Sequence, residues 1–284
     1  MKRLVLACID GSSYSSAVCD AAAWAALQME TPLKFLHVLH KEQAPPHADL
    51  SGSIGLGARE SLLEELAALD EKRGKLAQER GRQLLSAAKL QARTAGVAEP
   101  ESLQRHGGLV ETLAEREDEI RLLVMGKRGE AAEVASEHLG SHLERVLRAL
   151  PRPILVTNAE FRSPRRVMLA FDGSATARKA LEMVAASPLF RGLPCHLVRV
   201  GNETPEAREE LARARLVLEM AGFEAPAVIL PGEAESALSQ YQQEHGIDLM
   251  IMGAYGHSRI RHLLIGSTTT AMLRRSTIPL LLLR

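Results

Sequence analysis

The sequence contains one series of motifs twice, and this duplication constrains the fold more than any other feature. Residues 5–12 (VLACIDGS) correspond to residues 167–174 (VMLAFDGS). LLVMG in the first half corresponds to LMIMG in the second, and a Gly-Ser pair then begins a helical pattern in each. Each half closes with a proline and an aliphatic run. Four matched motifs in one order predict an internal duplication.

A chain of 284 residues is long enough for two small domains, each with its own core. We place the first at residues 1–158, with a helical insert at residues 41–95, and the second at residues 164–284. The short polar link between them predicts domains that dock against each other.

Within each half, short aliphatic runs alternate with longer segments whose apolar residues recur at helical spacing. Continuous aliphatic runs are typical of strands buried on both faces of a parallel sheet. The pattern predicts an α/β fold with two tandem doubly wound domains, each a five-stranded, mostly parallel sheet flanked by helices. In the second half we expect strands at residues 166–171, 195–200, 227–230, 249–252 and 279–283, and helices at residues 175–186, 206–221, 234–245 and 267–275.

The composition argues against several classes of partner. The 35 Lys and Arg residues balance the 35 Asp and Glu residues, and aromatic residues make up only 3%. Nucleic-acid and membrane-surface binding are therefore not expected. No apolar run reaches the roughly 20 residues of a membrane helix, and no leader cleavage site is visible, so we expect a cytoplasmic protein. Cys8, Cys19 and Cys195 form no C-x-x-C pair and are interpreted as packing residues, with a reactive thiol at Cys19 as the alternative.

The insert combines a Pro- and Gly-containing loop with a long charged helical stretch at residues 59–93. Apolar residues lie along one face of this predicted helix. We expect that face to cover the sheet; the alternative is an arm that binds a partner. The face comprises Leu62, Leu66, Leu69, Leu76, Leu84 and Ala88.

The loop after the fourth strand of the second half has the composition of a phosphate-binding loop. Gly253 and Gly256 allow tight turns and close approach of the backbone to a ligand. Residues 266–268 (Gly-Ser-Thr) begin a predicted helix, whose N-terminus carries free N–H groups and a partial positive charge. Arg259 and neighbouring basic residues could add cationic contacts, although a solvated loop is an equal explanation. The spacing matches neither a Walker P-loop nor a dinucleotide-binding turn.

Asp10 and Asp172 follow the first strand of their halves. Ligands of open parallel sheets bind at the carboxyl ends of strands. An aspartate there can accept hydrogen bonds from sugar hydroxyls, hold a metal ion, or simply cap the next helix. Its recurrence beside a glycine loop favours a ligand role. The sequence shows no convincing metal-binding histidine spacing and no Ser/His/Asp arrangement, so no catalytic residue is assigned.

These motifs resemble the universal stress protein family in its tandem form. Gly253, Gly256, Gly266 and Ser267 match the family pattern G-x2-G-x9-G-[ST], and the resemblance covers the chain except the insert. It implies an ATP site in which Asp172 and Val200 frame adenine and ribose while the glycine loop holds the phosphates, with or without Mg²⁺. The implied set is Asp172, Val200, Met252, Gly253, Gly256, His257, Gly266, Ser267 and Thr268; a weaker set in the first half is Asp10, Val38, Gly126, Gly129, Gly140 and Ser141.

The first half departs from the family pattern. Ten residues, instead of nine, separate Gly129 from Gly140, and Glu130, Glu133 and Glu137 lie between them. Negative charge there opposes a triphosphate. We therefore expect the principal nucleotide site in the second half.

Three functions are considered. The first is an ATP-binding regulatory stress-response protein without dedicated chemistry. The second is a slow metal-dependent ATPase or phosphotransferase at the same site. The third is a nucleotide-independent protein-interaction module that uses the insert. The resemblance also implies pairing of the two halves through their final strands as an intrachain pseudo-dimer, and allows a homodimer of chains.

Overall fold

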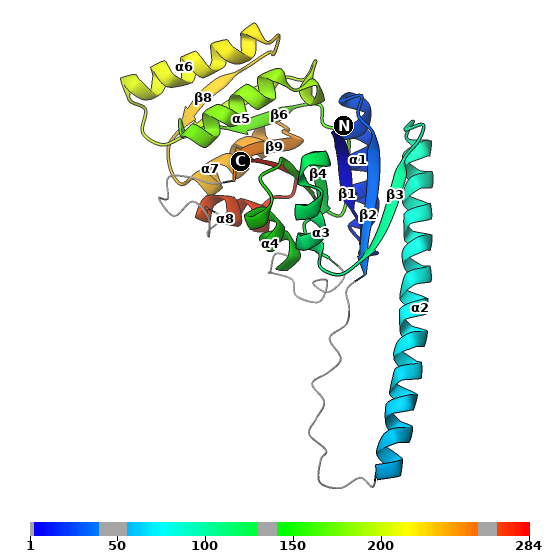
Figure 1. Ribbon diagram of the computed structural model, residues 1–284. Helices are drawn as coiled ribbons and strands as arrows, with labels where there is room; N and C mark the ends of the chain where they lie inside the picture. Colours follow the sequence, from blue (N-terminus) through cyan, green and yellow to red (C-terminus); the bar gives the residue numbers. More distant parts are fainter. Residues whose placement is uncertain (1–2, 40–55, 130–140, 255–265) are drawn as a thin grey trace.

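The computed structural model describes residues 3–39, 56–129, 141–254 and 266–284, with only the backbone described for residues 56–64 and 141 (Figure 1). We call residues 1–158 the first half and residues 164–284 the second half. The strands are β1 (Leu4–Cys8), β2 (Leu33–Leu39), β3 (Glu101–His106), β4 (Ile120–Gly126), β5 (Ile154–Thr157), β6 (Val167–Ala170), β7 (Cys195–Val200), β8 (Ala227–Leu230), β9 (Leu249–Gly253) and β10 (Leu280–Leu283). The helices are α1 (Ser15–Gln28), α2 (Leu56–Thr94), α3 (Leu109–Glu115), α4 (Ser141–Ala149), α5 (Ala175–Ala186), α6 (Pro205–Met220), α7 (Ala234–Glu244) and α8 (Ser267–Arg275), with short 3-10 turns η1 (Glu117–Glu119) and η3 (Pro188–Phe190).

All ten strands form one sheet in the order β3-β2-β1-β4-β5-β10-β9-β6-β7-β8. Within each half the strands are parallel, in the doubly wound order that places the first strand at the centre. Only β5 and β10 pair antiparallel, with Leu281 opposite Leu155. The predicted α/β fold with a mostly parallel sheet is confirmed, and the second-half strands and helices lie within one or two residues of their predicted ends.

Two apolar cores cover the two faces of the sheet. On one face the strands pack against α1, α5, α6 and the last turns of α2. On the other face they pack against α3, α4, α7 and α8. The inner strands β1, β4, β5, β9 and β10 are buried on both sides, which explains why their sequences are nearly unbroken apolar runs.

Side chains also join the two halves on either side of the β5–β10 pair. The ring of Trp24 in α1 lies 5.7 Å from the ring of Phe161 in the link between the halves. Nζ of Lys127 donates to the carbonyl of Ser276 over 3.0 Å. The first contact ties the link to α1, and the second ties the end of α8 to the first half.

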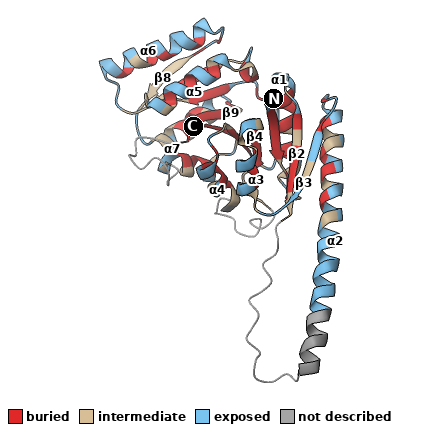
Figure 2. Cartoon of the chain, viewed as in Figure 1, coloured by how far each residue is buried: buried red, intermediate tan, exposed pale blue. Residues whose placement is uncertain are grey.

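The helix α2 corrects one sequence expectation. Near its end Leu85, Ala88 and Ala92 are buried against the sheet, whereas upstream Leu69 and Leu76 are 49% and 63% exposed. The prediction that the leucine face covers the sheet is therefore wrong for this upstream part, which projects away from the body (Figures 1 and 2). The cause is length, since α2 has 39 residues and its counterpart α6, which spans the sheet, has 16. The side chain of Leu62 lies outside the described residues.

The cysteines are packing residues within this fold. Cys19 and Cys195 are buried and Cys8 is half-buried. Burial raises the pKa of each of these thiols to about 12, which opposes thiolate chemistry at neutral pH. Within the described residues, every helix is too short or too polar to cross a bilayer.

Candidate functional site

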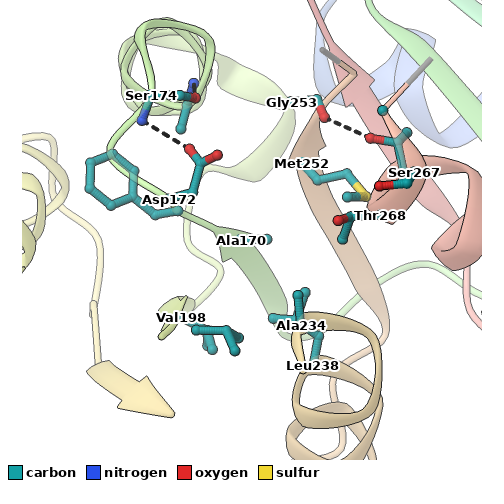
Figure 3. Close-up of a pocket in the computed structure, with 15 residues that line it drawn as sticks. Ala170, Asp172, Ser174, Val198, Ala234, Leu238, Met252, Gly253, Ser267 and Thr268 are labelled. Atoms are coloured by element: carbon teal, nitrogen blue, oxygen red, sulfur yellow. Dashed lines mark hydrogen bonds between the residues drawn. The ribbon is translucent and has the colours of Figure 1, made fainter. Parts of the chain in front are cut away.

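A pocket with a volume of about 390 Å³ opens at the carboxyl ends of β6, β7 and β9, beside the first turns of α5, α7 and α8 (Figure 3). This is the edge at which doubly wound sheets bind ligands, and the volume lies within the range of small-molecule sites. Its lining consists of Ala170, Phe171, Asp172, Ser174, Ala177, Val198, Val200, Ala234, Leu238, Met252, Gly253, Gly266, Ser267, Thr268 and Thr269.

Asp172 lies at the rim of the pocket, directly after β6. One of its carboxylate oxygens accepts a hydrogen bond from the backbone N–H of Ser174 over 2.9 Å (Figure 3). Ser174 itself is the cap of α5, because its hydroxyl oxygen accepts from the N–H of Ala177 over 3.1 Å. Asp172 is exposed, and its contact with Ser174 holds the turn. The cap of α5 is Ser174, so Asp172 does not serve as the cap of this helix.

Beside this turn, Glu210 of α6 forms a cluster with two arginines. Its carboxylate accepts from Arg178 of α5 over 2.6 Å and from Arg199 of β7 over 2.7 Å. These two hydrogen bonds lower the pKa of Glu210. A Cβ atom at Gly173, whose φ is +75°, would collide with that carboxylate. The positive φ favours glycine next to Asp172, and the cluster packs directly against this position.

The first turn of α8 forms the polar end of the pocket. Gly266 precedes the helix, Ser267 and Thr268 are exposed, and the turn contains no acidic residue. Backbone N–H groups in the first turn of a helix have no partner within the helix and carry a partial positive charge. Buried Thr269 donates its hydroxyl hydrogen to the carbonyl of Gly253 over 3.2 Å, which fixes this turn against the end of β9.

The opposite end of the pocket is apolar. Val198 and Val200 project from the same face of β7, and Met252 lies at the end of β9 (Figure 3). Ala234 and Leu238, one turn apart on α7, complete this wall. The described lining contains a single charged side chain, that of Asp172. The pocket therefore combines an apolar slot, one carboxylate and an N–H-rich helix start.

Most residues predicted for the second-half site line this one pocket. Gly256 and His257, together with Arg259, lie outside the described residues. Sequence reasoning missed the α7 wall, because Ala234 and Leu238 belong to an ordinary helix pattern with no motif. The predicted residues that line the pocket are Asp172, Val200, Met252, Gly253, Gly266, Ser267 and Thr268.

The corresponding region of the first half has different contacts. The carboxylate of Asp10 accepts from the N–H of Ser12 over 3.1 Å and lies close to Ser15 Oγ. A Cβ at Gly129 would lie only 2.6 Å from Oδ2 of Asp10, so the loop after β4 contacts this carboxylate directly. A Cβ at Gly126 would lie 2.7 Å from Cβ of Tyr14.

The other first-half residues implied by the resemblance belong to β2, to α4 and to the segment before α4. Val38 is half-buried near the end of β2. Ser141 begins α4, as Ser267 begins α8. Gly140 and the three glutamates of this loop lie outside the described residues. The two halves thus share the backbone plan and the contact of the first aspartate with the turn that follows it.

The histidines of the two cores are engaged in hydrogen bonds inside the protein. Groups of three or more His, Cys, Asp or Glu side chains that could hold a metal ion do not occur among its described residues. Nδ1 of His37 lies 2.8 Å from the carbonyl of Ile9, and Nδ1 of His196 lies 2.9 Å from the hydroxyl of Tyr241. Both histidines are buried with a polar partner.

Comparison with known proteins gives a consistent result. The model of the universal stress protein family matches residues 1–158 and 201–284. The chain is similar to universal stress protein Slr1230 of Synechocystis sp., with 41% identity over 288 residues that cover 100% of both proteins. It is 27% identical over 81 residues to universal stress protein MJ0577 of Methanocaldococcus jannaschii, which covers 28% of this chain and 50% of that protein. The crystal structure of a universal stress protein from Archaeoglobus fulgidus has the same fold, with a TM-score of 0.74, 20% identity, and coverage of 99% and 98% of the two chains.

Proposed function

Because the chain belongs to the universal stress protein family, we propose that it is a regulatory protein that binds one ATP molecule in the pocket of its second half. The observation that carries the proposal is the division of this pocket into an apolar end and a helix N-terminus, with one carboxylate between them. A nucleotide has the matching sequence of parts, since a flat base is joined to phosphates through a hydroxyl-bearing sugar.

The lining supports a specific orientation. The base packs between Val200 and Leu238, because that end offers apolar surface. The phosphates lie at the first turn of α8, where free N–H groups favour negative charge. Asp172 accepts hydrogen bonds from the sugar hydroxyls, since a carboxylate repels phosphates and needs a donor as its partner.

A divalent cation is compatible with this arrangement. Mg²⁺ in proteins is commonly held by one or two carboxylates together with substrate phosphates. In this pocket the phosphates and the hydroxyls of Ser267 and Thr268 would hold it while Asp172 stays at the sugar, and its chemical contribution would be to neutralise phosphate charge.

The first half is a poorer candidate for the same ligand. Asp10 makes the same contact with the N–H of Ser12 that Asp172 makes with Ser174, but Gly129 also lies against its second oxygen. Sugar hydroxyls would have to displace the loop that contains Gly129. We therefore propose a stoichiometry of one nucleotide per chain.

Regulation is favoured over dedicated catalysis by the composition of the pocket. Asp172 is the single ionisable side chain of its described lining, and its carboxylate is occupied by the turn and, in this proposal, by the sugar. General base catalysis needs a second group that can accept a proton from water. In contrast, α8 is followed by β10, which pairs with β5 of the first half. Nucleotide contacts at α8 thus act on the helix next to the β5–β10 pair, which connects the two halves.

Calorimetric titration of the purified chain with ATP tests the proposal. Gly266→Val places two methyl groups beside the backbone that lines the pocket, so we expect loss of measurable ATP binding. Retained affinity in this variant would contradict the proposed site. Phosphate release with Mg²⁺ separates the enzyme alternative: ATP that remains intact over hours supports regulation, whereas turnover that disappears in Asp172→Ala supports a metal-dependent ATPase.

A further inference from the structure

The apolar end of the second-half pocket lies between β7 and α7, and a buried hydrogen bond joins these two elements beneath it. His196 lies two residues before Val198, so it projects from the same face of β7. Tyr241 lies one turn after Leu238, on the same face of α7. Nδ1 of His196 lies 2.9 Å from the hydroxyl oxygen of Tyr241. These two residues, which we call the His–Tyr pair, therefore join β7 to α7 next to Val198 and Leu238, which line the pocket (Figure 3).

Both members of the His–Tyr pair are inside the protein. His196 is 8% exposed and Tyr241 is 7% exposed, and burial raises the pKa of Tyr241, so the phenol is neutral at physiological pH. Their rings meet edge to face with centroids 5.8 Å apart, and the ring of His245 stacks on Tyr241 at 3.9 Å. Buried polar groups need a hydrogen-bond partner, so the imidazole and the phenol satisfy each other only while α7 rests on β7. The pair is thus sensitive to any movement between the two elements that form the apolar end of the pocket.

The first half has a different arrangement at the same level. β2 aligns with β7 through Val38 and Val200, and α3 aligns with α7 through their first residues. The residues that then correspond to the His–Tyr pair are Lys34 and Arg116. Each forms an ion pair with a carboxylate of its own half, over 2.9 Å and 3.0 Å. The fold can therefore be built without a buried imidazole at this level, which favours a role for the His–Tyr pair in the pocket over a general role in the fold.

The charges around His196 oppose a proton on its ring. Burial lowers the pKa of His196, and the positive charges of His245 at the end of α7 and Arg166 before β6 lower it further. Glu224, before β8, acts in the opposite direction but is exposed. The carboxylate of Asp248, before β9, accepts a hydrogen bond from the backbone N–H of Arg166 over 3.0 Å. A proton on the buried ring is therefore poorly compensated, and it favours a state in which water reaches the ring.

Resting on the nucleotide site proposed above, we propose that the His–Tyr pair keeps the apolar end of the pocket closed around the base, so that a proton on His196 and a bound nucleotide oppose each other. With the neutral ring, α7 rests on β7 and Leu238 contacts the base. With a protonated ring, α7 loosens from β7 and this wall moves away from the base. Linkage makes the effect reciprocal: to the degree that a proton weakens nucleotide binding, nucleotide binding expels the proton. The chain therefore binds nucleotide above the ordinary histidine pKa near 6.5 and releases it as the pH falls below that value.

Adenosine is the probe for this linkage. It carries the base and the sugar hydroxyls but no phosphate, so its own charge does not change between pH 7.5 and pH 5.5. Calorimetric titration of the wild-type chain should show an affinity for adenosine that falls by about fivefold or more over this range. Circular dichroism at pH 5.5 checks that the chain stays folded during the measurement.

Two histidine variants isolate the titrating group. His196→Gln has no ring to titrate, so its affinity for adenosine should change by less than about twofold between the two pH values. His106→Gln is the matched control, since His106 is exposed on β3, at the other edge of the sheet from β8. This control should reproduce the wild-type fall.

Proton release gives a readout that a purely structural role would not change. At pH 6.0, titrations in two buffers with different ionisation enthalpies measure the protons released per adenosine bound. We expect release by the wild-type chain and none by His196→Gln. Tyr241→Phe keeps the ring but removes the hydroxyl, so its affinity at pH 7.5 should fall severalfold. This variant tests the pair independently if His196→Gln does not fold.

The results that contradict the inference differ from those that contradict the proposed function. A wild-type affinity that stays constant from pH 7.5 to pH 5.5 overturns the inference, as does a fall that persists in His196→Gln. Unchanged affinity in Tyr241→Phe would likewise overturn it. These results leave the proposed function intact, because adenosine and ATP still bind at pH 7.5. Absence of binding at both pH values overturns the proposed function itself, and the inference with it.

Discussion

The hydroxyl of Thr269 donates a hydrogen bond to the carbonyl of Gly253 over 3.2 Å, and this contact ties the first turn of α8 to the end of β9. The two residues flank the segment 255–265. Thr269 is buried, and through this bond it fixes the N–H groups of the turn that we assign to phosphates. Preorganised donors bind an anion more tightly than donors that must be ordered on binding.

Thr269→Val should weaken ATP binding by loosening the first turn of α8. It preserves shape but leaves the carbonyl of Gly253 without this donor, which we expect to cost about 1 kcal/mol in the free energy of unfolding. ATP affinity should fall severalfold in calorimetry. Thr269→Ser keeps the hydroxyl and should retain most of the affinity. Equal affinities for the valine variant and the wild type would show that this hydrogen bond does not organise the site.

Asp172→Ala should affect adenosine more than metal-free ATP. The substitution removes an acceptor for sugar hydroxyls, and hydrogen bonds to a charged group contribute about 1.5–3 kcal/mol. With ATP, the loss is partly offset, because a negative charge near the phosphates is also removed. Parallel titrations with adenosine and ATP in a chelating buffer measure the two effects. A larger loss for metal-free ATP would place Asp172 at the phosphates instead of the sugar.

Two glycines of α2 should respond in opposite ways to alanine. A Cβ at Gly81 would collide with the side chains of Gln104 and His37, so Gly81→Ala should lower the free energy of unfolding. Gly74 has no atom within 4 Å of the equivalent position, and Gly74→Ala should raise helix stability by up to about 1 kcal/mol. Denaturant unfolding of the two variants compares them directly. A neutral Gly81→Ala would contradict the close packing of α2 on β2 and β3.

The buried imidazole of His196 should make stability depend on pH. Burial lowers the pKa of His196, the positive charges of His245 and Arg166 add to the shift, and Glu224 opposes it. A depressed folded-state pKa means that the folded protein prefers the neutral ring. Its contribution to stability is therefore present above the ordinary histidine pKa near 6.5 and is lost as the pH falls below that value.

The histidine effect can be isolated by substitution. His196→Gln should flatten the fall in unfolding free energy between pH 7.5 and pH 5.5, relative to the wild type, because a glutamine does not titrate. His106→Gln changes an exposed histidine on β3 and should leave the pH profile unchanged. A wild-type profile in His196→Gln would assign the pH dependence to another group.

The sequence predicts the fold well where burial determines residue type. β9 and β10, which are buried apolar runs, and α5 and α8, which have clear starts at residues 175 and 267, lie within one residue of their predicted ends. The prediction that the upstream part of α2 covers the sheet was wrong, because leucines at helical spacing indicate an apolar face but not what covers it. The spacing of Leu69 and Leu76 is the same whether a sheet, a second chain or solvent lies opposite.

The site residues likewise divide into those that sequence motifs predict and those that only the fold brings together. Asp172, Gly253 and Gly266 belong to motifs whose spacing is visible along the chain, and the sheet brings them together at one edge. The α7 wall could not be identified, because Ala234 becomes part of the pocket only through the packing of α7 over β7. The Glu210 cluster likewise depends on contacts between α5, α6 and β7.

The most direct test of the nucleotide site compares ATP stoichiometry in two matched variants. Ala234 and Leu109 begin the helices that follow the third strand of each half, α7 and α3. Ala234→Phe fills the apolar end of the second-half pocket, and Leu109→Phe makes a similar change in the first half. In calorimetric titrations we predict one ATP per wild-type chain, one per Leu109→Phe chain and none per Ala234→Phe chain. Undiminished ATP binding by Ala234→Phe, or a loss of binding in Leu109→Phe alone, would contradict the assignment of the nucleotide to the second half.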